Sequence, residues 1–135
     1  MNTSETKETM VSLNEQLYGK AVNFFDLEQE SVRAGIIRSA YSTDEVMLVM
    51  NVLQRGMDLR PHKHDDFDQL VLITKGEVDY YIEETPHRLR EGSLLLVPAG
   101  AMHHVDPITE EAHNIDLFFP PRQDYAHMLE YVKGL

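Results

Sequence analysis

Three histidines and one glutamine are spaced so that they could hold a metal ion. His62 and His64 stand one residue apart, and alternate residues of an extended segment point to the same face, so two imidazoles can aim at one point. Gln69 begins an apolar stretch, and His103 follows a second apolar stretch and a Pro-x-Gly turn. Histidine is the commonest metal ligand in proteins. The sequence therefore predicts a metal site built from His62, His64, Gln69 and His103.

The fourth ligand has a competitor in the preceding residue. Asp68 is anionic and would hold a divalent ion more firmly than an amide does. Neighbouring strand residues face opposite ways, however, and Gln69 shares its face with Val71 and Ile73, which would point into a core. We favour Gln69, with Asp68 as the alternative.

The chemistry of such a site follows from the charge of its ligands. Three imidazoles and an amide are all neutral, so the ion would keep its full positive charge. This set favours Lewis-acid chemistry, in which the ion polarises a carbonyl or enolate oxygen. A ferric state would lack the carboxylate that helps to stabilise it. Nickel, zinc, manganese and ferrous iron are all candidate metals, with one ion expected per chain.

The elements that must position these residues are mostly short strands. Alternating or apolar runs bounded by Gly, Pro, Ser and Asp predict an all-β antiparallel sandwich or barrel. A short helix is expected at 11–18, and Gly35 is a candidate bulge within the second strand. Apolar spacing after Pro120-Pro121 predicts a C-terminal helix over 122–133. The expected strands are 22–27, 32–41, 45–54, 68–74, 77–83, 93–97 and 112–119, and residues 85–90 are expected to form a strand or a loop.

Length and composition limit the possible classes of protein. Residues 1–20 are rich in Ser, Thr, Glu and Asn and predict a flexible tail. The length of 135 residues predicts a single domain over 21–135. A net charge of −11 argues against nucleic-acid binding, which needs clustered cations. The absence of cysteine leaves no disulfides and no thiolate ligands. With no signal-peptide pattern and no run of about 20 apolar residues, we expect a cytoplasmic protein without a membrane partner.

The spacing of the candidate ligands resembles the paired motifs of the cupin superfamily. The first motif is matched by Gly56, His62, His64, Gln69 and Gly76, with Gln where most cupins have Glu. The second is matched by Gly92, Pro98, Gly100 and His103, with Pro107 where the final Asn would stand. The resemblance covers about half of the chain. It implies a jelly-roll barrel (a double-stranded β-helix) with a short C-terminal helix, a metal held by His62, His64, Gln69 and His103, and a homodimer.

The end of the last expected strand is similar to that of a particular group, the KdgF-type cupins, which ketonise unsaturated uronates. In that group three His and one Gln bind the metal, and an Asp, a Phe and an Arg line the pocket. Carried over by position, these residues are Asp116, Phe118 and Arg122. The resemblance implies that Asp116 moves a proton, that Arg122 binds the carboxylate of an anionic sugar, and that Phe118 shapes the pocket.

Three functions remain open at this point. The leading hypothesis is a metal-dependent isomerase-like enzyme that tautomerises or ring-opens a small sugar acid. The second is a ferrous-iron oxygenase of the cupin type, against which the neutral Gln69 counts. The third is a non-catalytic cupin that binds a small metabolite. The other histidines, His87, His104, His113 and His127, are not expected to be ligands; His87 and His113 are expected either at the surface or in contact with the ligands rather than with the metal.

Overall fold

The computed structural model describes residues 12–130, without the side chains of residues 123 and 124. Its nine described strands account for most of the regular structure, and the fold is all-β as predicted. The strands are β1 (Glu30–Arg33), β2 (Ile36–Ser42), β3 (Met47–Gln54), β4 (Gln69–Lys75), β5 (Val78–Ile82), β6 (Thr85–Leu89), β7 (Leu94–Val97), β8 (His103–Pro107) and β9 (Glu111–Phe118). The short helices are α2 (Leu13–Leu17), η1 (Phe24–Asp26) and η2 (Gln123–Met128).

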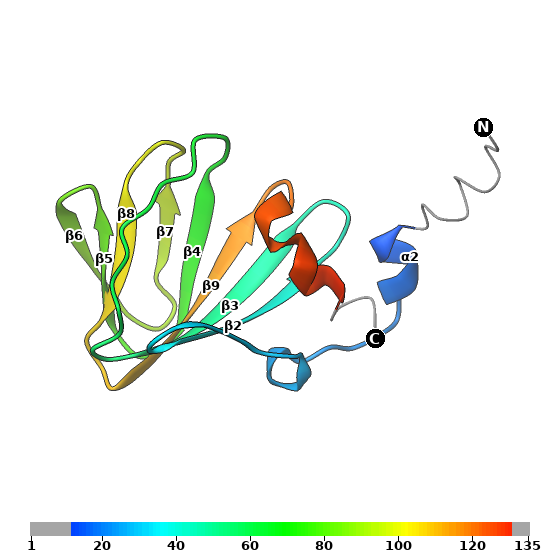
Figure 1. Ribbon diagram of the computed structural model, residues 1–135, viewed down its shortest axis with the longest axis horizontal. Coiled ribbons are helices and arrows are strands. Elements are labelled where there is room, and N and C mark those ends of the chain that lie inside the picture. Colours follow the sequence, from blue (N-terminus) through cyan, green and yellow to red (C-terminus); the bar gives the residue numbers. More distant parts are fainter. Residues whose placement is uncertain (1–11, 131–135) are drawn as a thin grey trace.

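The strands form two antiparallel sheets. The larger sheet has the order β1-β2-β3-β9-β4-β7, and the smaller has the order β6-β5-β8. Figure 1 shows the smaller sheet at the β7 and β4 end of the molecule, with η2 near β3 and β9. In the larger sheet β9 lies between β3 and β4, so strands distant in the sequence become neighbours. The predicted jelly-roll arrangement is therefore confirmed.

The core lies between the two sheets and follows from strand alternation. On β4, Val71 and Ile73 are fully buried, whereas Leu70 and Leu72, which alternate with them, are partly exposed on the outer face. The inward residues pack against Val78 and Tyr80 of the smaller sheet. Apolar burial of this kind contributes about 25 cal/mol per Å² of surface removed from water. Gln69 begins the same strand on the same inward face, so packing of the core holds its backbone in place.

Two of the expected strands are corrected. Residues 22–27 contain the 3-10 turn η1, because the Asn23 side chain accepts from the Phe25 amide and caps a turn there. The expected strand over 32–41 is a hairpin of β1 and β2, and Gly35 forms its turn with φ +85° in place of a bulge. The region 103–107, for which no strand was predicted, is β8.

Both ends of the described chain are helical. Ser12 caps α2 by accepting from the Glu15 amide, and Leu17 is buried, so the short helix expected at 11–18 is present over Leu13–Leu17. The Asp44 carboxylate accepts from the Leu13 amide. The C-terminal helix begins as the 3-10 helix η2, where an α-helix was expected. Residues 1–11 and 131–135 of these two predictions lie outside the described residues. Within residues 12–130 no helix has the length and apolar character needed to cross a membrane.

Candidate metal centre

The two histidine motifs are joined by backbone hydrogen bonds. The His62 amide donates to the His103 carbonyl at 3.0 Å, and the His103 amide donates to the His62 carbonyl at 2.8 Å. The Gly100 amide donates to the His64 carbonyl at 2.7 Å. His62 forms an isolated bridge with His103, and no regular strand covers His62 and His64. The loop is nonetheless fixed, because the turn before β8 supplies the partners that a neighbouring strand would supply.

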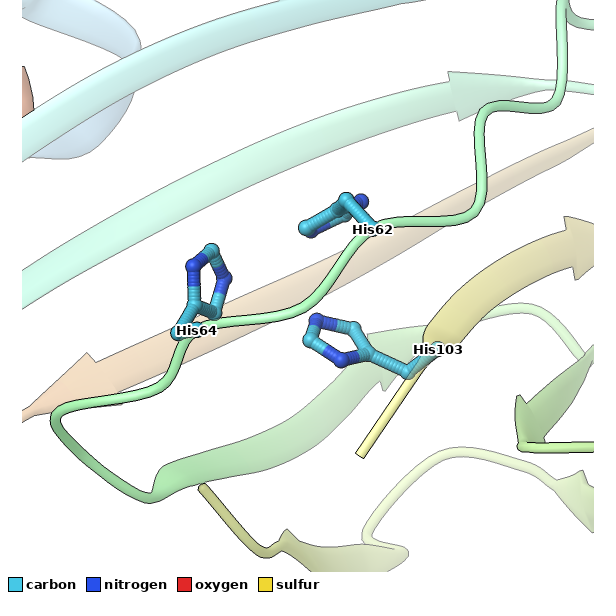
Figure 2. Close-up of side chains that lie close together, drawn as sticks. All are labelled: His62, His64 and His103. Atoms are coloured by element: carbon cyan, nitrogen blue, oxygen red, sulfur yellow. The ribbon is translucent and has the colours of Figure 1, made fainter. Parts of the chain in front are cut away.

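The three imidazoles converge on one space. One ring nitrogen from each of His62, His64 and His103 lies within 4.8 Å of the other two. Figure 2 shows the rings of His62 and His64, from one loop, and of His103, from the start of β8, gathered around this space. His103 is buried, His64 is half-buried and His62 is exposed, so one side of the cluster is open to solvent.

Backbone carbonyls set which ring nitrogen carries the proton. Nδ1 of His62 lies 3.0 Å from the Arg60 carbonyl oxygen, and Nδ1 of His103 lies 3.0 Å from that of Ala101. A carbonyl only accepts, so each Nδ1 carries a hydrogen and donates. The lone pair of each ring is then on Nε2, as a metal ligand requires. Burial lowers the pKa of both His62 and His103, which favours the neutral, metal-binding form.

Gln69 lines the same cavity as His62, whereas Asp68 is not among the residues that line it. The Gln69 side chain is 4% exposed, and its Nε2 donates to the Tyr80 hydroxyl at 3.2 Å. Its Oε1 is buried without a hydrogen-bond partner, as is Nε2 of His103. The Asp68 carboxylate instead accepts from the Ala99 amide at 2.8 Å and stabilises the Pro-x-Gly turn. Two buried acceptors without partners are costly in a folded protein, and a bound cation would satisfy both.

Asp116 is held by two asparagines at the wall of the same cavity. One carboxylate oxygen accepts from Asn51 at 3.0 Å and the other from Asn114 at 2.7 Å. Burial raises the pKa of Asp116 to about 6, against the lowering effect of hydrogen bonds from Gln69 and the two asparagines. The predictions from the sequence did not include Asn51 or Asn114. Asn114 shares a face of β9 with Asp116, so strand alternation could have found it.

Arg122 lies among aromatic rings next to the histidines. Its guanidinium carbon lies 4.0 Å from the Tyr125 ring centre and 5.1 Å from that of Phe118. Its Nη1 lies 3.3 Å from Nε2 of His64. Nε2 of His64 can therefore bind a metal ion only if the Arg122 guanidinium moves away from it. Phe118 is 1% exposed and contacts the His64 ring edge-on. Phe118 therefore packs against the side chains of His64 and Arg122.

One cavity joins most of these groups. It is lined by His62, Gln69, Tyr80, Asp116 and Arg122 among other residues. The cluster does not include any of the four other histidines in the described part of the chain, although His104 also lines the cavity. His104 stacks on Tyr81. His113 is 8% exposed and hydrogen-bonds to Glu111, so of the two places expected for it the surface is excluded.

Comparison with known proteins agrees with this geometry. A family model described as an AraC-like ligand binding domain matches residues 54–119. The chain is 31% identical over 97 residues to the pectin degradation protein KdgF of Dickeya dadantii, covering 71% of this chain and 88% of that protein. The chain belongs to the cupin superfamily and to its KdgF group.

Solved structures give the same relationship. The structure of KdgF from Halomonas sp. matches this cupin with a TM-score of 0.71 and 28% identity, covering 78% of this chain and 97% of that one. An RmlC-like cupin from Shewanella frigidimarina matches with a TM-score of 0.69 and 24% identity, covering 77% of this chain and 93% of that one. The second match speaks for the fold alone.

Proposed function

We propose that this cupin is a metal-dependent enzyme that tautomerises or ring-opens a small unsaturated sugar acid of the uronate type. The observation that carries the proposal is the convergence of three histidine nitrogens within 4.8 Å, next to a cavity that Asp116 and Arg122 also line. The similarity to KdgF, named as a pectin degradation protein, supports the choice of a uronate.

The metal would be held by His62, His64, Gln69 and His103. The partnerless Oε1 of Gln69 and Nε2 of His103 support this set. Nickel, zinc, manganese and ferrous iron all accept imidazole and amide ligands. When bound, a divalent ion at this place supplies Lewis-acid polarisation of a carbonyl or enol oxygen.

Asp116 is the group proposed to move the proton. Tautomerisation removes a proton from an enol oxygen and adds one to the neighbouring carbon, so no atom is gained or lost. A carboxylate that lines the cavity can accept the first proton and deliver the second. Asn51 and Asn114 donate to its two oxygens and fix the plane of the carboxylate.

Arg122 is proposed to bind the substrate, and Phe118 is proposed to hold the Arg122 side chain in position. A guanidinium donates two parallel hydrogen bonds to a carboxylate, which orients the sugar acid as well as holding it. Packing against Tyr125 and Phe118 restricts the guanidinium to a small range of positions. Its contact with His64 supports a carboxylate-binding position beside the proposed metal site.

The test is an Asp116→Asn variant assayed with an unsaturated uronate, together with its metal content. We expect metal binding to be retained and kcat to fall by a factor of about 10²–10⁴. Asp106→Asn, on β8 and outside the cavity lining, is the matched control and should leave kcat unchanged. Undiminished turnover in Asp116→Asn would overturn the assigned role.

A non-catalytic ligand-binding function is the second candidate, favoured by the match to the AraC-like ligand binding domain model. It predicts saturable binding of a sugar acid with no product formed by the metal-loaded protein. Product formation that depends on the metal excludes it as the sole function.

A further inference from the structure

Cations are concentrated around the cavity in a chain that is acidic overall. The chain has 12 lysines and arginines against 23 acidic residues. Arg33, Arg38, Arg60 and Arg122 all line this one cavity. Among the lining residues of the described chain, Asp116 is the single carboxylate. A single carboxylate on a substrate needs only one guanidinium, which Arg122 can supply. The presence of three further arginines at the cavity is then left without a purpose.

The three further arginines come from neighbouring parts of the fold. Arg33 ends β1, Arg38 lies on β2, and Arg60 precedes His62 in the loop after β3. Burial, followed by the nearby charge of Arg60, lowers the pKa of Arg33, as expected where like charges are crowded together. Crowding of cations costs free energy unless an anion enters the site.

The acidic partners of these arginines lie outside the cavity lining and are shared. The Asp58 carboxylate contacts Arg60 at 2.9 Å, and its backbone carbonyl accepts from Arg33 Nε at 2.7 Å. Glu30 lies 3.6 Å from Arg38 through one oxygen and 2.8 Å from His127 through the other.

Arg38 is the best placed of the three. Its side chain is 13% exposed, and its Nε is buried without a hydrogen-bond partner. Its guanidinium carbon lies 4.3 Å from the centre of the Tyr125 ring, which also contacts Arg122. The Tyr125 ring therefore connects Arg38 to the proposed carboxylate-binding Arg122.

We propose that Arg38, supported by Arg33 and Arg60, forms a second anion-binding subsite, so that the ligand of this cavity carries two carboxylates. The inference rests on the proposed function for the place of the first carboxylate at Arg122. Two kinds of sugar acid share the required chemistry. One is a single sugar acid with a carboxylate at each end, and the other is a short uronate oligomer.

The test is calorimetric binding of three stable ligands to the metal-loaded full chain. These are galacturonate with one carboxylate, galactarate with two on one carbon chain, and saturated digalacturonate with two on separate rings. We expect at least one of the two-carboxylate ligands to bind about tenfold or more tightly than galacturonate. If galactarate binds most tightly, the ligand of this cavity is a single sugar acid with two carboxylates. If digalacturonate binds most tightly, the ligand is a uronate oligomer. Equal affinity for all three overturns the proposal.

Variants assign the effect to the subsite. Arg38→Gln should remove the advantage of the two-carboxylate ligand while leaving the Kd for galacturonate within about twofold. Arg33→Gln should reduce part of the affinity difference between the two-carboxylate ligand and galacturonate. This variant tests the proposal if Arg38→Gln does not fold. Arg88→Gln, an exposed arginine on β6 paired with Asp79, is the control and should bind as the wild type does. An Arg38→Gln variant that keeps the full advantage contradicts the assignment.

The binding experiment is independent of turnover, so failures of the two proposals can be told apart. If Asp116→Asn retains activity but galactarate or digalacturonate still binds tightly through Arg38, the catalytic assignment fails and the subsite stands. If Asp116→Asn loses activity but the three ligands bind equally, the subsite fails and the catalytic assignment stands.

Discussion

The side-chain nitrogen of Gln69 donates to the hydroxyl of Tyr80 at 3.2 Å, while Gln69 Oε1 is left without a partner. Tyr80 comes from β5 of the smaller sheet and is 3% exposed, and its ring stacks on His103. One side chain thus contacts two of the four candidate ligands. We infer that Tyr80 fixes the Gln69 amide with its oxygen available to the metal.

Tyr80→Phe should therefore weaken metal binding without removing any ligand. Loss of a group that orients a ligand raises the metal Kd by about 10–100-fold. Competition with a chromophoric chelator measures this Kd directly. Tyr81→Phe, whose ring stacks on His104, is the control and should keep the wild-type Kd. An unchanged Kd in Tyr80→Phe would show that Gln69 is oriented by other contacts.

Gln69→Ala should lower the metal content of the purified protein. We expect about one divalent ion per chain in the wild type and a clear reduction in the variant, measured by elemental mass spectrometry. Gln69→Glu should restore binding, since a carboxylate oxygen replaces the amide oxygen. Asp68→Asn is the matched control and should retain the metal, because Asp68 binds the Ala99 amide. Metal at the wild-type level in Gln69→Ala would count against Gln69 as a ligand.

Glu111 should make stability depend on pH in the acid range. Hydrogen bonds from Lys75, then His113 and Gln54, lower the pKa of Glu111 from 4.5 to about 2. A carboxylate whose pKa is lower in the folded state stabilises it above the unfolded pKa, and this contribution is lost as the pH falls toward 2. The carboxylate is 36% exposed, so screening limits the contribution to about 1 kcal/mol or less.

The pH effect can be measured as the difference in Tm between wild type and Glu111→Gln. This difference should be largest above pH 4.5 and should shrink as the pH is lowered toward 2. Glu110→Gln, at the adjacent exposed position, should show little difference at any pH. A Glu111→Gln difference that grows on acidification would contradict the sign of the effect.

Gly76 should tolerate alanine much less well than Gly92. Both have positive φ, so alanine is strained by about 1–2 kcal/mol at either position. A Cβ at Gly76 would also lie 2.5 Å from the Glu111 carbonyl oxygen and from Thr109 Oγ1, whereas one at Gly92 meets nothing within 4 Å. Urea unfolding should therefore show a free energy loss at least about 1 kcal/mol greater for Gly76→Ala. Equal losses would mean that the contact is relieved by a small backbone shift.

A homodimer, expected from the sequence by resemblance, has a candidate interface on β7. This strand is an edge of the larger sheet, and its outward residues Leu94 and Leu96 are 63% and 59% exposed. They lie opposite Leu72 and Leu70 of β4, which extends the apolar face. We propose that a second copy of the chain covers this face.

Light scattering on a size-exclusion column should then give about twice the chain mass of 15.6 kDa. Leu94→Lys with Leu96→Lys should yield a monomer, because two buried ammonium groups would face apolar surface. Ile37→Lys, at an exposed position on β2, is the control for adding a charge to a strand. A monomeric wild type, or a double variant that remains dimeric, would exclude this interface.

The sequence was sufficient for those features that depend on local spacing. Alternation predicted the inward face of β4 and the positions of Asp116 and Phe118 on one face of β9, because the side-chain period of a strand is two. Glycines at fixed intervals marked the turns. The prediction of a strand over 22–27 was wrong because the Asn23 side chain caps a 3-10 turn there. This single side-chain contact outweighs the strand propensity of the segment.

Tertiary structure decided which groups meet and which atoms they present. Asn51 donates to Asp116 across 65 positions of sequence, and Arg38 reaches the cavity of Arg122 from another strand. Hydrogen bonds orient the side chains of His103 and Gln69 so that His103 Nε2 and Gln69 Oε1 have no partners. The groups that make these hydrogen bonds lie in a turn and in a strand of the other sheet. Residue types and spacing predicted a metal site. Only packing between distant segments determines how its atoms point, because each orientation depends on a hydrogen bond whose partner is brought there by the fold.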